Sequence, residues 1–530
     1  MTRGGPGRFA AVVVTDLRLR LRQTSTLVVF LLLSAMPYLW VPDPATGRAV
    51  FVVDGRRALY DSAALGLATG VLCTVLLGLL GYYLVSNSLA RDLRTRCGFV
   101  LASTPVGNLE YLLAKVVGNA AFLAALGAGY MVCAMAMQVV RGEAPLEPWR
   151  FAVQYLWLLP TCVLFVAAVA VLFESVPRLS GKLGDVVFFV GWIAMSGAAA
   201  AFHGVGPVRP GIGVADLLDV SGMGFVVRQM RLQTGSDSFS FGATSFDAGL
   251  DPVAFPGLVG GGEWVLPRLA GLLPAVAVFL LALVAFHRFD PARVRGAAAR
   301  RGRGYLQRLE ALAAPLVRPL LRRGLAGAGA GPNLAGAVVA EASLVLLTQP
   351  LGALALVTTA VLALLLTEAA VGGGVLPAAM AGLGLVLAGA AGREARHGTT
   401  ALVAAVPALD RRYVGWKLAS ALAVGAAFAA VPAARLLLAG SPGRALTALV
   451  GTFFVAGMAV SLGVLGGSPK AFLVLFLTFL YVALNDGGRT PALDFAGFAG
   501  TAGPRQWAGY VLVTAAALGL ATAVHRRRRA

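Results

Sequence analysis

The sequence predicts an all-α polytopic membrane protein of about 12 transmembrane helices, arranged as two parallel six-helix repeats that each follow an amphipathic elbow helix. Three observations predict it: an apolar composition, basic residues concentrated in alternate connections, and a charged connection that occurs twice. Of the 530 residues, 58% are hydrophobic and 13% are charged, with a mean hydropathy of +0.80. Soluble domains carry about 25% charged residues, so this composition indicates a protein of the bilayer.

The apolar stretches suffice for about a dozen helices at roughly 20 residues per span. We expect spans near residues 24–41, 62–86, 113–139, 151–174, 185–202, 263–287, 350–367, 373–391, 417–438, 445–466, 470–485 and 506–525. Surface helices are expected at 7–22 and 334–347, ahead of the first span of each half. The predicted parts are a first six-helix half (1–290), a basic cytoplasmic linker (291–332) and a second six-helix half (333–530).

The basic residues predict the orientation of the spans. The formal net charge is +20, and the Lys and Arg residues gather in every second connection. These connections are the N-terminus, 91–115, 178–182, 288–323, 393–417, Lys470 and the C-terminal 526–529. The positive-inside rule assigns them to the cytoplasm, which predicts a multi-pass protein of the cytoplasmic (inner) membrane with both termini inside. The positive charge therefore indicates membrane orientation, and we expect no nucleic-acid partner.

The two charged connections 91–115 and 393–417 align without a gap, because 393 minus 91 and 417 minus 115 both give 302. Arg91, Asp92, Arg94, Pro105, Tyr111 and Lys115 match Arg393, Glu394, Arg396, Pro407, Tyr413 and Lys417. Upstream, Asp16 and Glu341 occupy corresponding places in the two surface helices, and downstream Asp219 and Asp494 lie in similar Leu-Asp motifs. Three matches in the same order predict a tandem duplication. Six spans per half give both copies the same orientation.

The connection 91–115 predicts a short helix on the membrane surface. Its charged residues must lie at or beyond the membrane face, because charges are costly in the bilayer centre. Ser103 or Thr104 could cap a helix, which Pro105 tolerates in its first turn. Leu109, Leu112 and Leu113 share one face of that helix, so we expect a short amphipathic element that ends before Lys115.

The motif Asp92–Arg94, followed by Ser103-Thr104-Pro105-Val106 and Tyr111–Lys115, resembles the ABC-2 type transporter permeases. An elbow helix, six spans per unit and a long outside loop before the sixth span are also similar to that family. The resemblance implies that both connections dock on an ATP-hydrolysing subunit. The implied interface residues are Arg91, Asp92, Arg94, Pro105, Lys115, Arg393, Glu394, Arg396, Pro407 and Lys417. Asp219 and Asp494 are candidates for an outer gate, with helix-capping aspartates in a folded lid as the alternative.

The resemblance implies the permease subunit of an ATP-driven exporter whose ATPase subunits are separate chains. The sequence lacks a G-x-x-x-x-G-K-[ST] phosphate loop, so we expect ATP on the partner and no cofactor on this chain. No catalytic residue and no metal ligand is predicted, and the chain is not expected to be an enzyme. Because both halves lie on one chain, a homodimer is not needed. Charge reversal at Asp92 or Glu394 is expected to uncouple ATP hydrolysis without unfolding the protein.

Two alternatives stay open. An ion-coupled secondary transporter can also have twelve spans in parallel halves, but it usually needs acidic groups near the bilayer midplane. Glu174, Asp185 and Glu368 lie near predicted span ends, where the side chains are expected to reach water. A membrane-embedded enzyme acting on lipid-linked substrates would need a polar catalytic cluster at one membrane face. Copurification of an ATPase separates both alternatives from the ATP-driven transporter.

Overall fold

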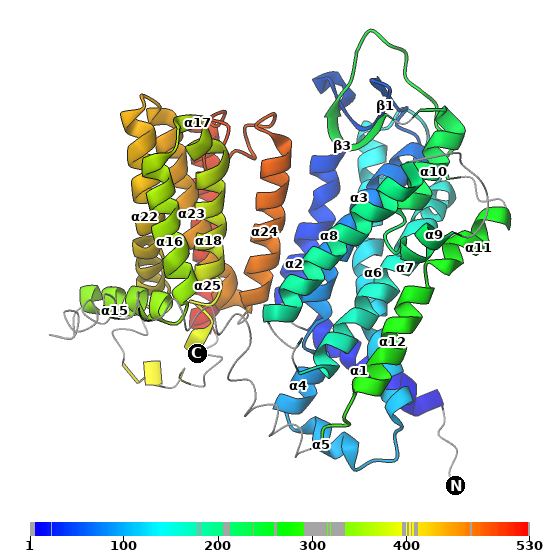
Figure 1. Ribbon diagram of the computed structural model, residues 1–530, viewed down its shortest axis with the longest axis horizontal. Coiled ribbons are helices and arrows are strands. Elements are labelled where there is room, and N and C mark those ends of the chain that lie inside the picture. Colours follow the sequence, from blue (N-terminus) through cyan, green and yellow to red (C-terminus); the bar gives the residue numbers. More distant parts are fainter. Residues whose placement is uncertain are drawn as a thin grey trace. The chain divides into compact units, whose positions relative to one another are not determined.

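The computed structural model divides into two compact units, residues 1–301 and 302–530, each described here by itself (Figure 1). It describes residues 6–290, 315, 319 and 334–527, with gaps at 23, 178, 180–181, 205–212, 237, 259–261, 395–398, 400–401, 404, 407–411 and 467–468. The predicted linker 291–332 therefore lies almost wholly outside the described residues.

The first unit is a helical bundle with a small sheet at one end (Figure 1). Its longer helices are α1 (Pro6–Leu21), α2 (Thr24–Trp40), α3 (Ser62–Val85), α6 (Asn108–Arg141), α7 (Pro148–Ser175), α8 (Lys182–Gly204), α10 (Met223–Thr234) and α12 (Leu273–Ala285). Short helices lie between them: α4 (Ser88–Arg94), α5 (Cys97–Ala102), α9 (Val214–Leu218) and α11 (Gly262–Ala270).

Helix α3 forms the centre of the first unit. Its most apolar 18-residue window is 89% buried, and it packs against α6 and α7. The helix begins where the Asp61 carboxylate accepts hydrogen bonds from the backbone N–H groups of Ala63 (3.1 Å) and Ala64 (2.8 Å). An aspartate in this position satisfies donors that have no partner within the helix. Helix α3 therefore supplies the core against which the other helices of this unit are arranged.

A three-stranded antiparallel sheet covers the end of the first unit opposite α4 and α5 (Figure 1). Strand β1 (Arg48–Val53) lies between β2 (Arg56–Arg57) and β3 (Phe239–Ser245). The turn at Asp54-Gly55 has positive φ at both residues (+49° and +77°), as a two-residue hairpin requires. The sheet was not predicted. The connection between α8 and α11 also contains two helices, α9 and α10.

The second unit is built from helices (Figure 1). They are α15 (Leu334–Leu347), α16 (Pro350–Leu365), α17 (Glu368–Ala370), α18 (Leu376–Leu387), α22 (Tyr413–Leu438), α23 (Pro442–Gly466), α24 (Pro469–Asp486) and α25 (Pro504–Arg527), with a π-helical turn at Val371–Val375. Helix α23 packs against α22, α24 and α25. Between α15 and α16 the chain bends by 95°, so the predicted surface helix at 334–347 is a separate element.

The structure confirms a largely helical protein with several apolar helices that could cross a membrane. Among the described residues, eight helices are long and apolar enough to cross a membrane, or nine if the bent pair α15–α16 is one span. Three of the expected spans contain shorter apolar helices, Val29–Trp40, Val187–Ala198 and Leu475–Leu484. All twelve predicted ranges fall on helices, and the number of crossings stays a prediction.

The expected amphipathic helix between Pro105 and Lys115 is wrong. Helix α6 runs without a break from Asn108 to Arg141, so Leu109, Leu112 and Lys115 all belong to it. The Ser103 and Thr104 hydroxyls donate to the carbonyls of Val100 and Leu101, both at 2.7 Å. They therefore terminate the preceding helix α5. Nothing in the sequence between Leu109 and Lys115 stops a helix, so α6 begins as soon as the turn after Pro105 ends.

Candidate functional site

Three elements of the first unit meet at a buried lysine. Lys115 Nζ lies 2.9 Å from the Asp16 carboxylate of α1 and 2.8 Å from the Asp92 carboxylate of α4. Arg91 also pairs with Asp16, and the Tyr111 hydroxyl donates to Asp92 at 2.7 Å. Lys115 is 2% exposed, Asp16 4% and Asp92 9%. The network therefore joins α1, α4 and the first turns of α6.

The second unit contains the same arrangement. Lys417 Nζ lies 2.7 Å from the Glu341 carboxylate of α15 and 2.5 Å from the Glu394 carboxylate. Arg393 lies 3.6 Å from Glu341, and the Tyr413 hydroxyl donates to Glu394 at 2.9 Å. Lys417 is 2% exposed, and both glutamates are buried. The two networks contain the same residue classes on corresponding elements, with glutamates in the second where the first has aspartates.

The burial of these groups changes what six of the predicted interface residues can do. Two carboxylates balance one lysine and one arginine in each network, and a buried charge is tolerated only when it is paired. Asp92, Lys115, Glu394 and Lys417 face inward, while Arg91 and Arg393 are half-buried. The ion pairs of these six residues hold the connections 91–115 and 393–417 in place. Any surface of these connections that contacts a partner is formed by other residues. Charge reversal at Asp92 would place a third cation beside Arg91 and Lys115, so this variant is expected to lose stability and not to keep the fold intact.

The other predicted interface residues are placed as follows. Pro105 is exposed in the turn between α5 and α6. Arg94 is the last residue of α4, and its side chain is outside the described part. Arg396 and Pro407 lie outside the described residues. Sequence comparison paired Asp16 with Glu341 but assigned them no role. The signal that could have revealed their role is that each is the one acidic residue of its predicted surface helix.

Glu174, at the end of α7, holds the start of α4. Its carboxylate accepts four backbone N–H bonds, from Asn87 (2.6 Å), Ser88 (3.0 Å), Leu89 (2.7 Å) and Ala90 (3.0 Å). These are the donors that a helix N-terminus leaves without an internal partner. Glu174 is partly exposed, so contact of its carboxylate with water stays a prediction, while the hydrogen bonds show that it also binds the N-terminus of α4. This role depends on tertiary packing, and no local sequence signal indicates it.

Arg20 fastens α1 to the end of α3. Its guanidinium donates to the carbonyls of Leu84 and Val85, both at 3.1 Å, and to the Asn119 side chain at 2.6 Å. Desolvation by burial lowers the pKa of Arg20, with Asp16 opposing this effect. Helix α1 is thus bound both to α3 and, through Asp16, to α6. It is attached to the bundle by buried polar groups as well as by its apolar face.

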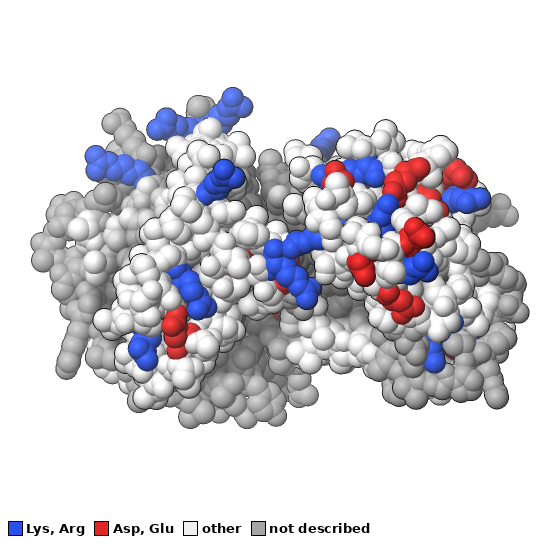
Figure 2. Space-filling view, turned by 90° about the horizontal axis from the view of Figure 1, so that it is seen from above, with Lys and Arg blue, Asp and Glu red and all other residues white. Residues whose placement is uncertain are grey.

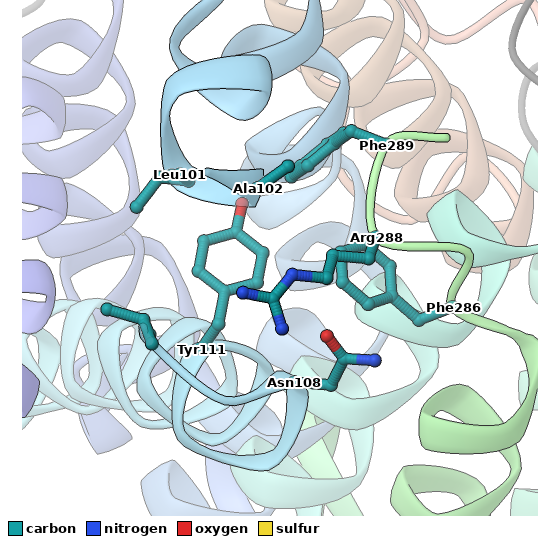
Figure 3. A pocket seen from close by; sticks show the side chains of 8 residues that line it. Leu101, Ala102, Asn108, Tyr111, Phe286, Arg288 and Phe289 are labelled. Atoms are coloured by element: carbon teal, nitrogen blue, oxygen red, sulfur yellow. The ribbon is translucent and has the colours of Figure 1, made fainter. Parts of the chain in front are cut away.

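The segment after α12, residues 286–289, packs against α5 and lines a small pocket together with it (Figure 3). The Phe286 ring stacks on Tyr111 with 5.7 Å between ring centroids, and the Phe289 ring meets Tyr111 at 5.9 Å. Arg288 donates to the Thr104 carbonyl at 2.8 Å. A Cβ added at Gly98 would lie 2.9 Å from the Phe289 ring, so only glycine permits this approach. The last helix of the unit is thereby joined to the connection 91–115.

Apolar side chains project from the same connections. Phe99 is 37% exposed and Val100 is 66% exposed on α5. In the second unit Leu402, which is 302 residues after Val100, is 70% exposed. Exposed apolar groups beside charged ones mark surfaces that contact lipid or another protein. Val100 and Leu402 are therefore the equivalent outward-facing positions of the two connections.

Asp219 and Asp494, the candidates for an outer gate, are each 3% exposed and bonded to their own loops. Asp219 accepts from the backbone N–H of Phe225 in the first turn of α10 at 2.8 Å. Asp494 accepts from the backbone N–H of Thr501 at 2.8 Å. The glycine three residues after each aspartate has positive φ, +76° at Gly222 and +79° at Gly497. These bonds match the alternative of capping aspartates in a folded loop, and a gating role stays a prediction.

Figure 2 looks onto the end of the first unit that carries the sheet, where acidic and basic side chains are interspersed. One pair is Arg57 and Glu143, 2.5 Å apart. The hydrogen bond from Arg57 lowers the pKa of Glu143, and burial raises the pKa of Tyr60 to about 12. Within the described part of the chain, no group of three or more His, Cys, Asp or Glu residues could hold a metal ion.

In comparisons with known proteins, no family model, no curated protein and no solved structure matches the chain. The apolar helices make this a multi-pass membrane protein, and its two buried networks are the candidate functional site.

Proposed function

We propose that the chain is the permease subunit of an ATP-driven exporter of the ABC-2 kind, worked by ATPase subunits on separate chains. The observation that carries the proposal is the buried lysine network that joins the surface helix, the connection after the second predicted span and the third predicted span in both units. A connection that served only to link two spans would not need a buried carboxylate and a buried lysine that meet a second carboxylate from the surface helix, since such groups are costly to bury.

The contacts of α4 and α5 attach the connection 91–115 rigidly to the helices around it. Glu174 attaches α4 to α7, Lys115 attaches it to α1 and α6, and Arg288 attaches α5 to the end of α12. A displacement of α4 and α5 would therefore reach four helices at once. Packed polar networks resist gradual deformation, so such a push favours movement of the helices as a body. This is what coupling to a soluble motor requires.

The partner surface in this proposal is formed by α5 and its counterpart in the second unit. Val100 and Leu402 are exposed apolar groups of these segments, while Asp92, Lys115, Glu394 and Lys417 are buried in ion pairs. An ATPase would bury these apolar groups in a groove and gain affinity from their removal from water. We further propose twelve crossings in two repeats of six, with both connections and both termini on the cytoplasmic side.

Site-specific photo-crosslinking tests this proposal. A photoreactive amino acid at Val100 or Leu402 in the full chain should capture a chain with a nucleotide-binding phosphate loop, and the captured complex should hydrolyse ATP. The same group at Val139, 71% exposed at the far end of α6, is the control and should capture no such chain. Capture from Val139 alone, or no ATP-hydrolysing partner at either connection, would contradict the proposal and favour a secondary transporter or a membrane-embedded enzyme.

A further inference from the structure

The corresponding ends of the two units differ in charge. In the first unit Phe286 stacks on Tyr111, and the arginine that follows, Arg288, turns inward to bond the Thr104 carbonyl. In the second unit His525 takes the place of Phe286 and stacks on Tyr413, with 4.6 Å between ring centroids and 7° between planes. The arginines that follow, Arg526 and Arg527, are exposed.

The stack brings three arginines to one end of the second unit. Arg412 precedes Tyr413 at the start of α22 and is exposed, and Arg526 and Arg527 follow His525 at the end of α25. The nearby carboxylates of Glu341 and Glu394 are turned inward and paired with Lys417. Asp410 and Arg411 lie outside the described residues and together add no net charge. The described surface here is therefore cationic.

An apolar helix face leads to this cationic end. Only 17% of the most apolar window of α25 is buried. Leu512 is 68% exposed, Val513 54% and Leu520 54%, and the last of these lies less than two turns from Arg526. A free phosphate would contact the arginines alone. A phospholipid would bind the arginines through its phosphate and pack an acyl chain against the apolar face of α25.

We propose that the second unit binds an anionic phospholipid, with the headgroup phosphate held by Arg412, Arg526 and Arg527 and an acyl chain lying along α25. Guanidinium groups suit phosphate because their N–H donors match its oxygens in pairs. Clusters of basic residues at the end of a membrane helix attract anionic lipid. This site is independent of the ATPase proposal, because it needs neither connection to contact a partner.

Lipid binding to the purified full chain tests the proposal. Native mass spectrometry in an uncharged detergent should show phosphatidylglycerol retained in preference to phosphatidylcholine. Each arginine raises affinity for an anionic surface roughly fivefold, so the triple variant Arg412→Gln, Arg526→Gln, Arg527→Gln should bind phosphatidylglycerol at least tenfold more weakly. The triple Arg→Lys variant keeps the charge but not the paired donors, so it should bind more weakly than the wild type and more tightly than the triple Gln variant, which separates loss of charge from loss of fold.

Arg505→Gln is the matched control, since Arg505 is exposed in the first turn of the same helix, at its opposite end. It should leave retention of phosphatidylglycerol unchanged. Equal retention by the triple Gln variant and the wild type would overturn the proposal. Displacement of the lipid by millimolar inorganic phosphate would assign the arginines to a soluble anion and overturn the lipid site.

Discussion

Lys115 and Asp16 are 99 residues apart in the sequence, yet their side chains meet at 2.9 Å in the interior of the first unit. Asp16 belongs to a helix that precedes every predicted span, and Lys115 lies in the third turn of α6. Their contact fixes the surface helix to the bundle at the connection 91–115. The pair Lys417–Glu341, at 2.7 Å, does the same in the second unit.

Replacing Lys115 by Met should destabilise the protein strongly, because the buried carboxylates of Asp16 and Asp92 would then share one cation, Arg91, in place of two. Loss of one partner from a buried ion pair costs about 3–5 kcal/mol. Thermal unfolding of the purified protein in detergent measures this loss, and Lys417→Met should behave alike. The exposed control Arg505→Gln should stay within about 0.5 kcal/mol of the wild type.

Adding Asp16→Asn and Asp92→Asn to Lys115→Met should recover part of the lost stability, since the buried carboxylate charges are then gone and the remaining cation, Arg91, is only half-buried. A polar group of similar shape costs less to bury than an unpaired charge. If Lys115→Met is as stable as the control, or if the triple variant is less stable than Lys115→Met, the network does not hold the connection as described.

Replacing Glu174 by Leu should loosen the start of α4. Four backbone N–H groups would lose their acceptor, and each buried group left without a partner costs about 1–3 kcal/mol. Hydrogen exchange of Ser88 to Arg94 should therefore accelerate at least tenfold, while the second unit is unchanged. Glu147→Leu, at the exposed opposite end of α7, is the control. Unchanged protection of α4 would show that Glu174 does not cap it.

Gly98→Ala should disturb the packing between α5 and the segment after α12, because its Cβ would meet the Phe289 ring at 2.9 Å. Overpacking of this kind costs about 1–3 kcal/mol. Gly107→Ala meets no atom within 4 Å and serves as the control. In a double-mutant cycle, Phe289→Ala should remove most of the penalty of Gly98→Ala. Additive losses would mean that the two residues do not contact each other.

Acid should remove the contribution of the Arg57–Glu143 pair at the sheet end of the first unit. The hydrogen bond from Arg57 lowers the folded-state pKa of Glu143 below its ordinary value of 4.5. A lowered pKa stabilises the fold above the unfolded value, and the contribution is lost as the pH falls through the folded value. Thermal unfolding should show wild type above Glu143→Gln at pH 7 and equal to it in strong acid. A difference that does not depend on pH would refute this.

The apolar helices were predictable because long hydrophobic runs have few alternatives in a membrane protein. The matching of 91–115 with 393–417 picked out Asp92, Lys115, Glu394 and Lys417, which all enter the two buried networks. Their contact with an ATPase stays a prediction. The direction of these side chains was not predictable. Arginines and aspartates in a loop are usually solvated, and only the fold shows that a carboxylate from a preceding helix reaches the lysine.

Other features depend on contacts that no local pattern indicates. Glu174 caps a helix more than 80 residues earlier in the chain, with 84–87 residues separating the partners. Strand β3 pairs with β1 although eight helices, α3 to α10, lie between them in the sequence. The two strands have six and seven residues, which is too short for their sequence pattern to predict a sheet. The helix break expected near Lys115 was wrong because the serine and threonine hydroxyls bond backward, to the helix that they follow.

The measurement that tests the central claim most directly is ATP hydrolysis by the chain reconstituted in lipid vesicles with the ATPase that copurifies with it. Val100→Asp together with Leu402→Asp should lower coupled hydrolysis at least tenfold, because a charge would replace each exposed apolar contact. Val139→Asp, at the far end of α6, should leave it unchanged, and all variants should unfold at the wild-type temperature. Full activity in the Val100→Asp, Leu402→Asp variant, or a wild-type chain that purifies without any ATP-hydrolysing partner, would contradict the account.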